Sequence, residues 1–185
     1  MAQTGISTAA EIRLPEWLAA WPLPAAPVGD HEAMALAVAI ARENVARTLF
    51  GPFGAVVRQD ATGEVIGVGV NLVGLMGNPV LHAETVAITL AGGRVWDGAT
   101  LFTSCEPCIM CLGAAHWGQL TRIVSAALKE DAEAIGFNEG AGTTQLRAQM
   151  AARGVLFQDG LLREQGVAVL RFYAESGGVI YGPKG

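Results

Sequence analysis

The segment TSCEPCIMCLGA, residues 103–114, places Cys108 and Cys111 three positions apart. Pro107, which precedes them, suits the first turn of a helix. Both thiols should therefore project from one helix start toward a common point. The free N–H groups and the positive dipole end at such a start favour thiolate over thiol. This spacing predicts a site for a single metal ion.

A second short motif, HAE at residues 82–84, supplies a third expected ligand. Its spacing also suits a helix start, so His82 and Glu84 can face the same cavity. One histidine and two cysteines give tetrahedral zinc three protein ligands and leave one position for water, which is typical of a catalytic site. Zinc lowers the pKa of such a water to about 7. Glu84 can then act as general acid and base, and we expect one Zn²⁺ per chain.

Two other interpretations of the cysteines stay open at this point. A structural zinc site would need a fourth ligand. Cys105, His31 or His116 could supply one, although none has the spacing of a zinc finger. A redox role for the C-x-x-C pair would leave the HAE motif unexplained. We expect Cys105 to be a buried structural thiol and His116 to be structural rather than a ligand.

Periodicity and turn residues along the rest of the chain indicate one α/β domain over residues 30–185. Residues 1–29 carry four prolines and predict an irregular arm, which packs either on its own subunit or on a partner. Helices are predicted over about 30–48, 82–91, 107–118, 144–153 and 161–175, and strands over about 53–58, 65–70, 100–103, 122–126 and 155–158. The turn at residues 60–63 indicates a hairpin. Strands that alternate with helices after a hairpin predict a mixed sheet covered on both faces.

The composition argues against a nucleic-acid-binding or membrane protein. The chain of 185 residues is 51% hydrophobic and 16% charged, with a formal net charge of −5 and no run of lysine or arginine. A binder of polyanions usually carries a basic stripe, and a membrane span needs about 20 apolar residues. Residues 1–8 lack the pattern of a signal peptide. Three clustered cysteines make a poor disulfide framework. We expect a cytoplasmic protein, with some surface covered by a partner subunit.

Several motifs together resemble a known group of enzymes. PFGA at residues 52–55, Asn71, the HAE motif and TSCEPCIMCLGA resemble the branch of the cytidine-deaminase-like superfamily that holds guanine deaminases and tRNA adenosine deaminases. An H-x-E…P-C-x-x-C arrangement is the signature of zinc deaminases. DAEAIGFNEG, residues 131–140, resembles a loop of bacterial guanine deaminases. GVIY, residues 178–181, resembles the tail of a subgroup that also accepts aminotriazines such as ammeline. The resemblance covers about residues 30–182.

The resemblance implies a three-layer α/β/α sandwich around a five-stranded mixed sheet, usually in a homodimer. It also implies two catalytic acids, Glu84 and Glu139, of which Glu139 recognises the substrate amino group and can move a second proton. Asn71 would hydrogen-bond the substrate ring. Ala83 would offer its backbone N–H to a substrate carbonyl.

Three further positions bear on the substrate. Phe53 and Trp117 match positions that stack on the substrate ring, although large aromatic residues are more often part of a core. Tyr181 would belong to a tail that closes the pocket. Asn138 departs from the resemblance, because related sequences often have aspartate there. This departure leaves open whether guanine is the best substrate.

The sequence therefore leads to one hypothesis with two alternatives. The hypothesis is a zinc-dependent hydrolytic deaminase of a free amino-heterocycle, with guanine to xanthine plus ammonia as the first choice and aminotriazines as further substrates. The enzymatic alternative is a tRNA adenosine deaminase or a nucleoside or cytosine deaminase. The non-enzymatic alternative is a structural zinc module.

Overall fold

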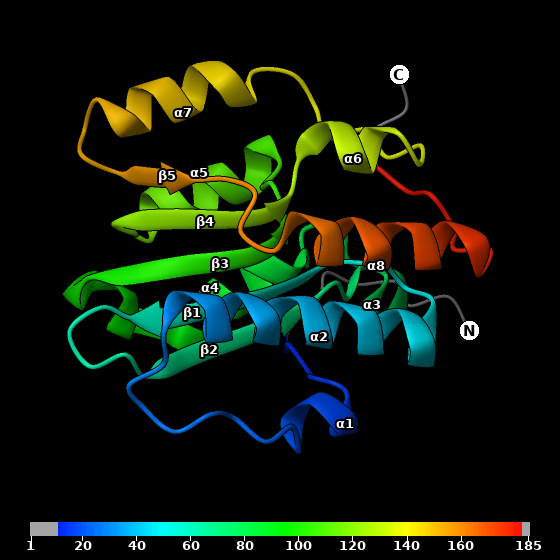
Figure 1. Cartoon of the computed structure of the whole chain (residues 1–185), viewed down its shortest axis with the longest axis horizontal. Coiled ribbons are helices and arrows are strands. Elements are labelled where there is room, and N and C mark those ends of the chain that lie inside the picture. Colours follow the sequence, from blue (N-terminus) through cyan, green and yellow to red (C-terminus); the bar gives the residue numbers. More distant parts are fainter. Residues whose placement is uncertain (1–10, 183–185) are drawn as a thin grey trace, which may run out of the picture.

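The computed structural model describes residues 11–182, and a five-stranded mixed sheet organises them (Figure 1). The strand order is β2-β1-β3-β4-β5. The strands are β1 (Gly54–Gln59), β2 (Val65–Val70), β3 (Ala99–Cys105), β4 (Arg122–Ala127) and β5 (Leu156–Gln158). β1 runs antiparallel to both β2 and β3, whereas the β3–β4 and β4–β5 pairs are parallel. The expected hairpin and mixed sheet are both present.

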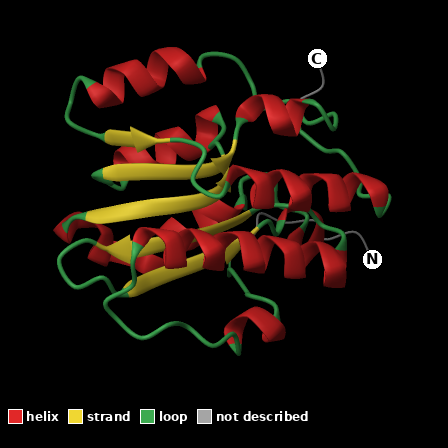
Figure 2. Cartoon of the chain, viewed as in Figure 1, coloured by secondary structure: helices red, strands yellow, loops and turns green. Residues whose placement is uncertain are grey.

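Helices cover both faces of this sheet (Figure 2). The helices are α1 (Glu16–Ala19), α2 (Asp30–Thr48), α3 (Val73–Met76), α4 (Ala83–Ala91), η1 (Gly92–Asp97), α5 (Ile109–Trp117), α6 (Lys129–Glu133), α7 (Thr143–Ala151) and α8 (Arg163–Glu175). α2 and α8 pack against each other and on one face of the sheet, while α4 packs on the other face beside α5, with α7 next to α5. Buried apolar side chains accordingly form two clusters. The three-layer sandwich is confirmed.

Glycines in β2 let α4 lie close to the sheet. A Cβ atom at Gly67 would lie 2.3 Å from the carbonyl oxygen of Ala87, and one at Gly69 would lie 2.2 Å from that of Ala83. Only a residue without a side chain allows this approach. The sequence of β2 therefore fixes the position of α4, and with it the HAE motif at the start of that helix.

The predicted elements correspond closely to the observed ones, with three differences. Pro107 does not lie inside the helix predicted over residues 107–118, because α5 begins at Ile109 with Cys108 as its N-cap. α3 and α6 are short helices in segments for which we expected no helix. The arm contains the single helical turn α1.

The described part of the arm, residues 11–29, packs on its own chain. Leu18 and Val28 are buried in the same apolar cluster as α2. Trp17 meets Trp21 edge to face, with ring centroids 5.9 Å apart. The first ten residues of the arm, including those in which we expected no signal peptide, lie outside the described part.

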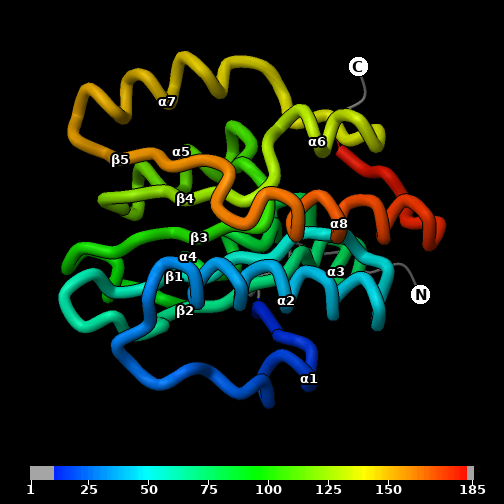
Figure 3. Tube along the Cα trace, in the orientation of Figure 1, coloured from blue at the N-terminus to red at the C-terminus, as the bar shows by residue number. Residues whose placement is uncertain are grey.

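The backbone trace shows how the end of the chain returns toward the sheet (Figure 3). After α8, the red segment runs back past α6. The hydroxyl of Tyr173 on α8 donates a hydrogen bond to the carbonyl oxygen of Val179 at 2.6 Å. This bond ties the tail to α8. Within residues 11–182, no helix is both long enough and apolar enough to cross a membrane.

Candidate active site

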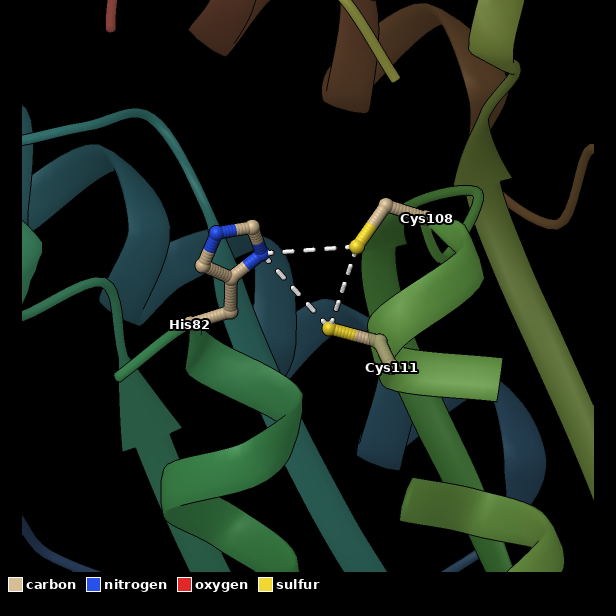
Figure 4. Close-up of side chains that lie close together, drawn as sticks. All are labelled: His82, Cys108 and Cys111. Carbon is tan, nitrogen blue, oxygen red and sulfur yellow. Dashed lines mark hydrogen bonds between the residues drawn. The ribbon is translucent and has the colours of Figure 1, made fainter. Parts of the chain in front are cut away.

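The three predicted metal ligands meet at two adjacent helix starts (Figure 4). His82 is the N-cap of α4 and Cys108 is the N-cap of α5, and both have extended backbone conformations. Nδ1 of His82 lies 3.6 Å from Sγ of Cys108 and 3.6 Å from Sγ of Cys111. The two sulfur atoms are also 3.6 Å apart. The ligand atoms thus form a nearly equilateral triangle.

This triangle fits tetrahedral zinc. With Zn–S bonds of about 2.3 Å and a Zn–N bond of about 2.0 Å, ideal tetrahedral angles place two sulfurs about 3.8 Å apart and each sulfur about 3.5 Å from the nitrogen. Within the described residues, no fourth histidine, cysteine, aspartate or glutamate joins the group. Three protein ligands around one position match a catalytic rather than a structural zinc site.

The two sulfur atoms titrate as a coupled pair. A proton shared between them, together with the nearby imidazole, lowers the pKa of Cys108 to about 4. The same interaction with Cys108, reinforced by burial, raises the pKa of Cys111 well above its usual value. The pair therefore holds one negative charge readily. A cation at the centre of the triangle would favour the second thiolate.

Glu84 lies in the first turn of α4, next to the metal triangle but outside it. Its side chain is 6% exposed. Burial raises the pKa of Glu84, the charge of Cys108 raises it further, and the charge of His82 opposes the shift. A buried carboxyl with a raised pKa holds its proton more readily than an exposed one, which suits a general acid and base. The HAE motif thus places a ligand and an acid–base group on one helix turn.

These groups open into a cavity of about 530 Å³. Several of its lining residues were predicted from the sequence: His82, Glu84, Cys108, Phe53, Asn138, Glu139 and Tyr181. Others, which come from separate loops and helix ends, were not predicted: Val73, Pro79, Glu106, Ile109, Met110 and Phe137. Phe137 lies in the segment that resembles the guanine deaminase loop, and Glu106, Ile109 and Met110 lie in the cysteine segment 103–114, whereas no motif pointed to Val73 or Pro79.

Glu139 enters the cavity from the loop between α6 and α7. Burial raises its pKa to about 7, with further contributions from the charges of Cys108 and Glu84. The charges of His82 and Lys129 oppose that rise. The cavity therefore holds two acids whose pKa values are both raised by burial, that of Glu139 to about 7.

The Glu139 loop is held by polar contacts rather than by regular secondary structure. Nζ of Lys129 donates to the carbonyl oxygen of Gly140 at 2.5 Å. The backbone N–H of Gly140 donates to Oδ1 of Asn138 at 3.0 Å. Asn138 thus turns the chain beside Glu139 while it lines the cavity. An aspartate could accept the same bond, so asparagine here removes a charge without removing the turn.

Aromatic rings form one wall of the cavity. Phe137 meets Phe53 with ring centroids 5.0 Å apart and Tyr181 with centroids 5.3 Å apart, both edge to face. The Tyr181 hydroxyl lies close to the Asn71 amide and to Gly51. The C-terminal tail therefore supplies part of the cavity wall.

Asn71 and Ala83, both predicted to bind the substrate, are buried and are not among the residues that line the cavity. Asn71 is 1% exposed, and its Oδ1 accepts the backbone N–H of Val73 at 3.0 Å. Its Nδ2 is buried and has no hydrogen-bond partner among the described residues. Ala83 is the first residue of α4, where a backbone N–H has no partner within the helix. Both positions thus offer a donor.

Trp117 is not brought to the cavity. It ends α5 with its side chain 83% exposed and is absent from the cavity lining. His116 and Cys105, which were considered as a fourth zinc ligand, also lie away from the triad. Nε2 of His116 lies 3.2 Å from a guanidinium nitrogen of Arg153, and Sγ of Cys105 lies 3.5 Å from the carbonyl oxygen of Leu128. Cys105 is buried, as expected of a structural thiol.

Comparison with known proteins agrees with this geometry. The family described as the cytidine and deoxycytidylate deaminase zinc-binding region matches residues 28–127. The chain belongs to this family. The enzyme is therefore a zinc deaminase, and its triad of one histidine and two cysteines is consistent with one zinc ion. The interpretations as a structural zinc module or a redox pair are set aside.

Among its relatives are guanine deaminases. That of Bacillus subtilis (strain 168) is 41% identical over 115 residues, which cover 60% of this chain and 72% of that protein. The structure of guanine deaminase from Nitrosomonas europaea superimposes with a TM-score of 0.83 at 32% identity, covering 92% of this chain and 99% of that one. A variant of NE0047 in complex with 8-azaguanine has a TM-score of 0.84 at 32% identity, covering 92% and 98%. The resemblance to guanine deaminases is confirmed.

Proposed function

We propose that this deaminase converts free guanine to xanthine and ammonia. The observation that carries the proposal is the pairing of Glu84 and Glu139 in one cavity beside the triad of His82, Cys108 and Cys111. Hydrolytic deamination adds water to the carbon that bears the amino group and then expels ammonia. It needs at least two proton transfers, and we assign them to these two acids.

Each group in and around the cavity has a separate role in the proposed reaction. Zinc, when bound by the triad, supplies the Lewis acidity that makes water a nucleophile near neutral pH. Glu84 takes a proton from that water and returns it to the ring nitrogen adjacent to the reacting carbon. Glu139, in its ionised form, accepts a hydrogen bond from the amino group; it then takes the proton of the hydroxyl group added to the ring carbon and passes it to the departing nitrogen as ammonia leaves. Nδ2 of Asn71 and the N–H of Ala83 bind acceptor atoms on the ring edge.

The lining of the cavity favours a small uncharged ring over a nucleotide. A volume of about 530 Å³ lies in the range of small-molecule sites, about 300–1,000 Å³. Among the described lining residues there are three glutamates and no lysine or arginine. A phosphate would therefore meet negative charge on entering. The aromatic wall of Phe53, Phe137 and Tyr181 suits a flat ring.

We also propose that the enzyme works as a homodimer in the cytoplasm. Several large apolar side chains on or near α4, η1 and α5 are exposed in the single chain: Val80, Leu90, Trp96 and Trp117. A second copy that covers this surface would remove them from water. A reducing compartment suits the three free cysteines. Light scattering of the purified protein measures the mass directly.

A substrate panel tests the proposal. Ammonia release is measured with guanine, ammeline, guanosine, cytosine and a tRNA anticodon stem-loop at one fixed salt concentration, because nucleic-acid binding depends steeply on salt. We expect kcat/KM for guanine to exceed the values for guanosine and the stem-loop by a wide margin. Ammeline is the expected second substrate. A preference for the stem-loop or for a nucleoside would overturn the proposal.

A further inference from the structure

Glu106 lies beside the metal-binding cysteines, yet protein donors occupy both of its carboxylate oxygens. It lies in the connection between β3 and α5 and lines the cavity. Its Oε1 accepts a hydrogen bond from Nη1 of Arg147. Its Oε2 accepts the backbone N–H of Lys129 at 3.1 Å. This third cavity acid is therefore engaged by the protein itself rather than presented to a substrate.

Arg147 is held on its other sides as well. Its Nη2 donates to Oδ2 of Asp159 at 2.6 Å, and Oδ1 of Asp159 accepts the hydroxyl of Ser125 at 2.6 Å. The guanidinium also lies over the ring of Phe157, 4.6 Å from the ring centre. The side chains of Arg147 and Glu106 are only 17% and 16% exposed. Breaking such a pair leaves a poorly solvated charge, so the pair is costly to separate.

The contacts of Glu106 come from both sides of the loop that carries Glu139. Lys129 begins α6, ahead of the loop, and its Nζ binds the carbonyl oxygen of Gly140 inside the loop. Arg147 lies on α7, the helix that follows the loop. The helices on either side of the loop are thus both tied to Glu106, one through a backbone N–H and the other through a guanidinium.

We propose that Arg147 is a positioning residue that, through Glu106, sets the distance between the metal-binding cysteines and Glu139. The proposal rests on the function proposed above for Glu139. Displacement of a catalytic group by about 1 Å can cost 10²-fold in rate. The Arg147–Glu106 pair joins α7 to the segment that leads into Cys108. It therefore fixes the Glu139 loop relative to the metal site, where the ring carbon of the substrate reacts.

A double-mutant cycle tests this coupling. Arg147→Met is combined with Glu139→Gln, and kcat is measured per bound zinc, with zinc determined by elemental analysis. We expect Arg147→Met alone to lower kcat about 10- to 100-fold, as is typical of residues that support a metal site. In the Glu139→Gln background, the same change should lower kcat by less than about 3-fold, because mutations at coupled sites are not additive.

Arg163→Met is the matched control. Arg163 lies on α8 and pairs with Glu130 and Asp131, so this variant loses an arginine and its ion pairs outside the cavity lining. We expect it to keep kcat within about 2-fold of the unaltered enzyme. Arg147→Lys is the conservative variant, and it should fold even if the methionine variant does not. Because lysine cannot bridge Glu106 and Asp159 with a fork of donors, we expect an intermediate loss that also shrinks in the Glu139→Gln background.

Hydrogen exchange gives a readout that does not depend on turnover. Backbone amides of residues 136–142 should exchange roughly 10-fold faster in Arg147→Met than in Arg163→Met, because a charge-assisted anchor of the loop is lost. Losses of kcat that simply multiply in the double mutant would overturn the proposal. So would a loss that disappears once kcat is expressed per zinc, or loop exchange equal to that of the control.

The cycle is run on whichever amino-heterocycle the unaltered enzyme deaminates fastest. A wrong assignment of guanine therefore shows in the unaltered enzyme. A wrong assignment of Arg147 shows only in the variants.

Discussion

The two acids of the cavity stand on supports of different kinds. Glu84 lies in the first turn of α4, which packs tightly on β2 over Gly67 and Gly69. Glu139 lies on an irregular loop that is held by hydrogen bonds between side chains and the backbone. Packing of a helix on the sheet fixes Glu84 next to the metal triad, whereas a few side-chain contacts fix the loop of Glu139, the acid that we propose faces the substrate. We infer that this architecture keeps the chemistry constant and leaves the choice of substrate open to change.

The largest effect is expected from Glu84→Gln, which tests the acid held rigidly by α4. Glutamine keeps the shape of the side chain but cannot carry the proton, so we expect a loss in kcat of about 10²- to 10⁴-fold. Zinc content and thermal unfolding should stay close to those of the unaltered enzyme, because Glu84 lies outside the ligand triangle. Glu32→Gln, an exposed position on α2, is the control. Turnover within a few-fold of the unaltered enzyme would remove Glu84 from the mechanism.

Glu139→Gln tests the acid on the loop. We expect turnover to fall about 10-fold or more, a smaller loss than for Glu84→Gln. If Glu139 must be ionised to accept the amino group, kcat/KM of the unaltered enzyme falls as the pH drops below its pKa of about 7. Bound zinc adds positive charge nearby and lowers that pKa, so the fall begins at or below pH 7. The variant should lack this acidic limb.

The measurement is kcat/KM between pH 5 and 9 for both enzymes, with unfolding monitored at each pH. The acidic limb would be reassigned to another group if it persisted unchanged in Glu139→Gln.

Features set by local spacing could be predicted from the sequence. The triad and Glu84 follow from two motifs at helix starts, and α2 from a long apolar periodicity that begins at residue 30. The same holds for β2, whose bounds match the prediction. In each case, neighbouring residues determine the geometry, so no knowledge of tertiary structure is needed.

Trp117 shows why the rest could not be predicted. It follows Cys111 by six residues, and at about 100° per residue it points about 120° around the helix axis from that ligand. Trp117 was expected at the cavity because it matches a ring-stacking position of related sequences, and the turn of α5 instead leaves it exposed. Val73, Pro79 and Phe137 line the cavity but were not predicted to do so, because they come from loops that meet only after the chain has folded.

The smallest expected effect concerns the tail, at Tyr181→Phe. The ring, and with it the aromatic wall, is kept, and only a buried hydroxyl without a hydrogen-bond partner in the described chain is removed. Loss of such a group is nearly neutral for folding, so the free energy of unfolding should change by less than about 0.5 kcal/mol. If the hydroxyl binds a substrate atom beside Asn71, KM should rise about 2- to 10-fold, the value of one hydrogen bond, while kcat stays almost constant. Steady-state kinetics on the fastest substrate, alongside thermal unfolding, separate the two quantities. A fall in kcat with unchanged KM would instead place Tyr181 with the proton carriers, and the division between a rigid chemical half and an adaptable recognition half would fail at the tail.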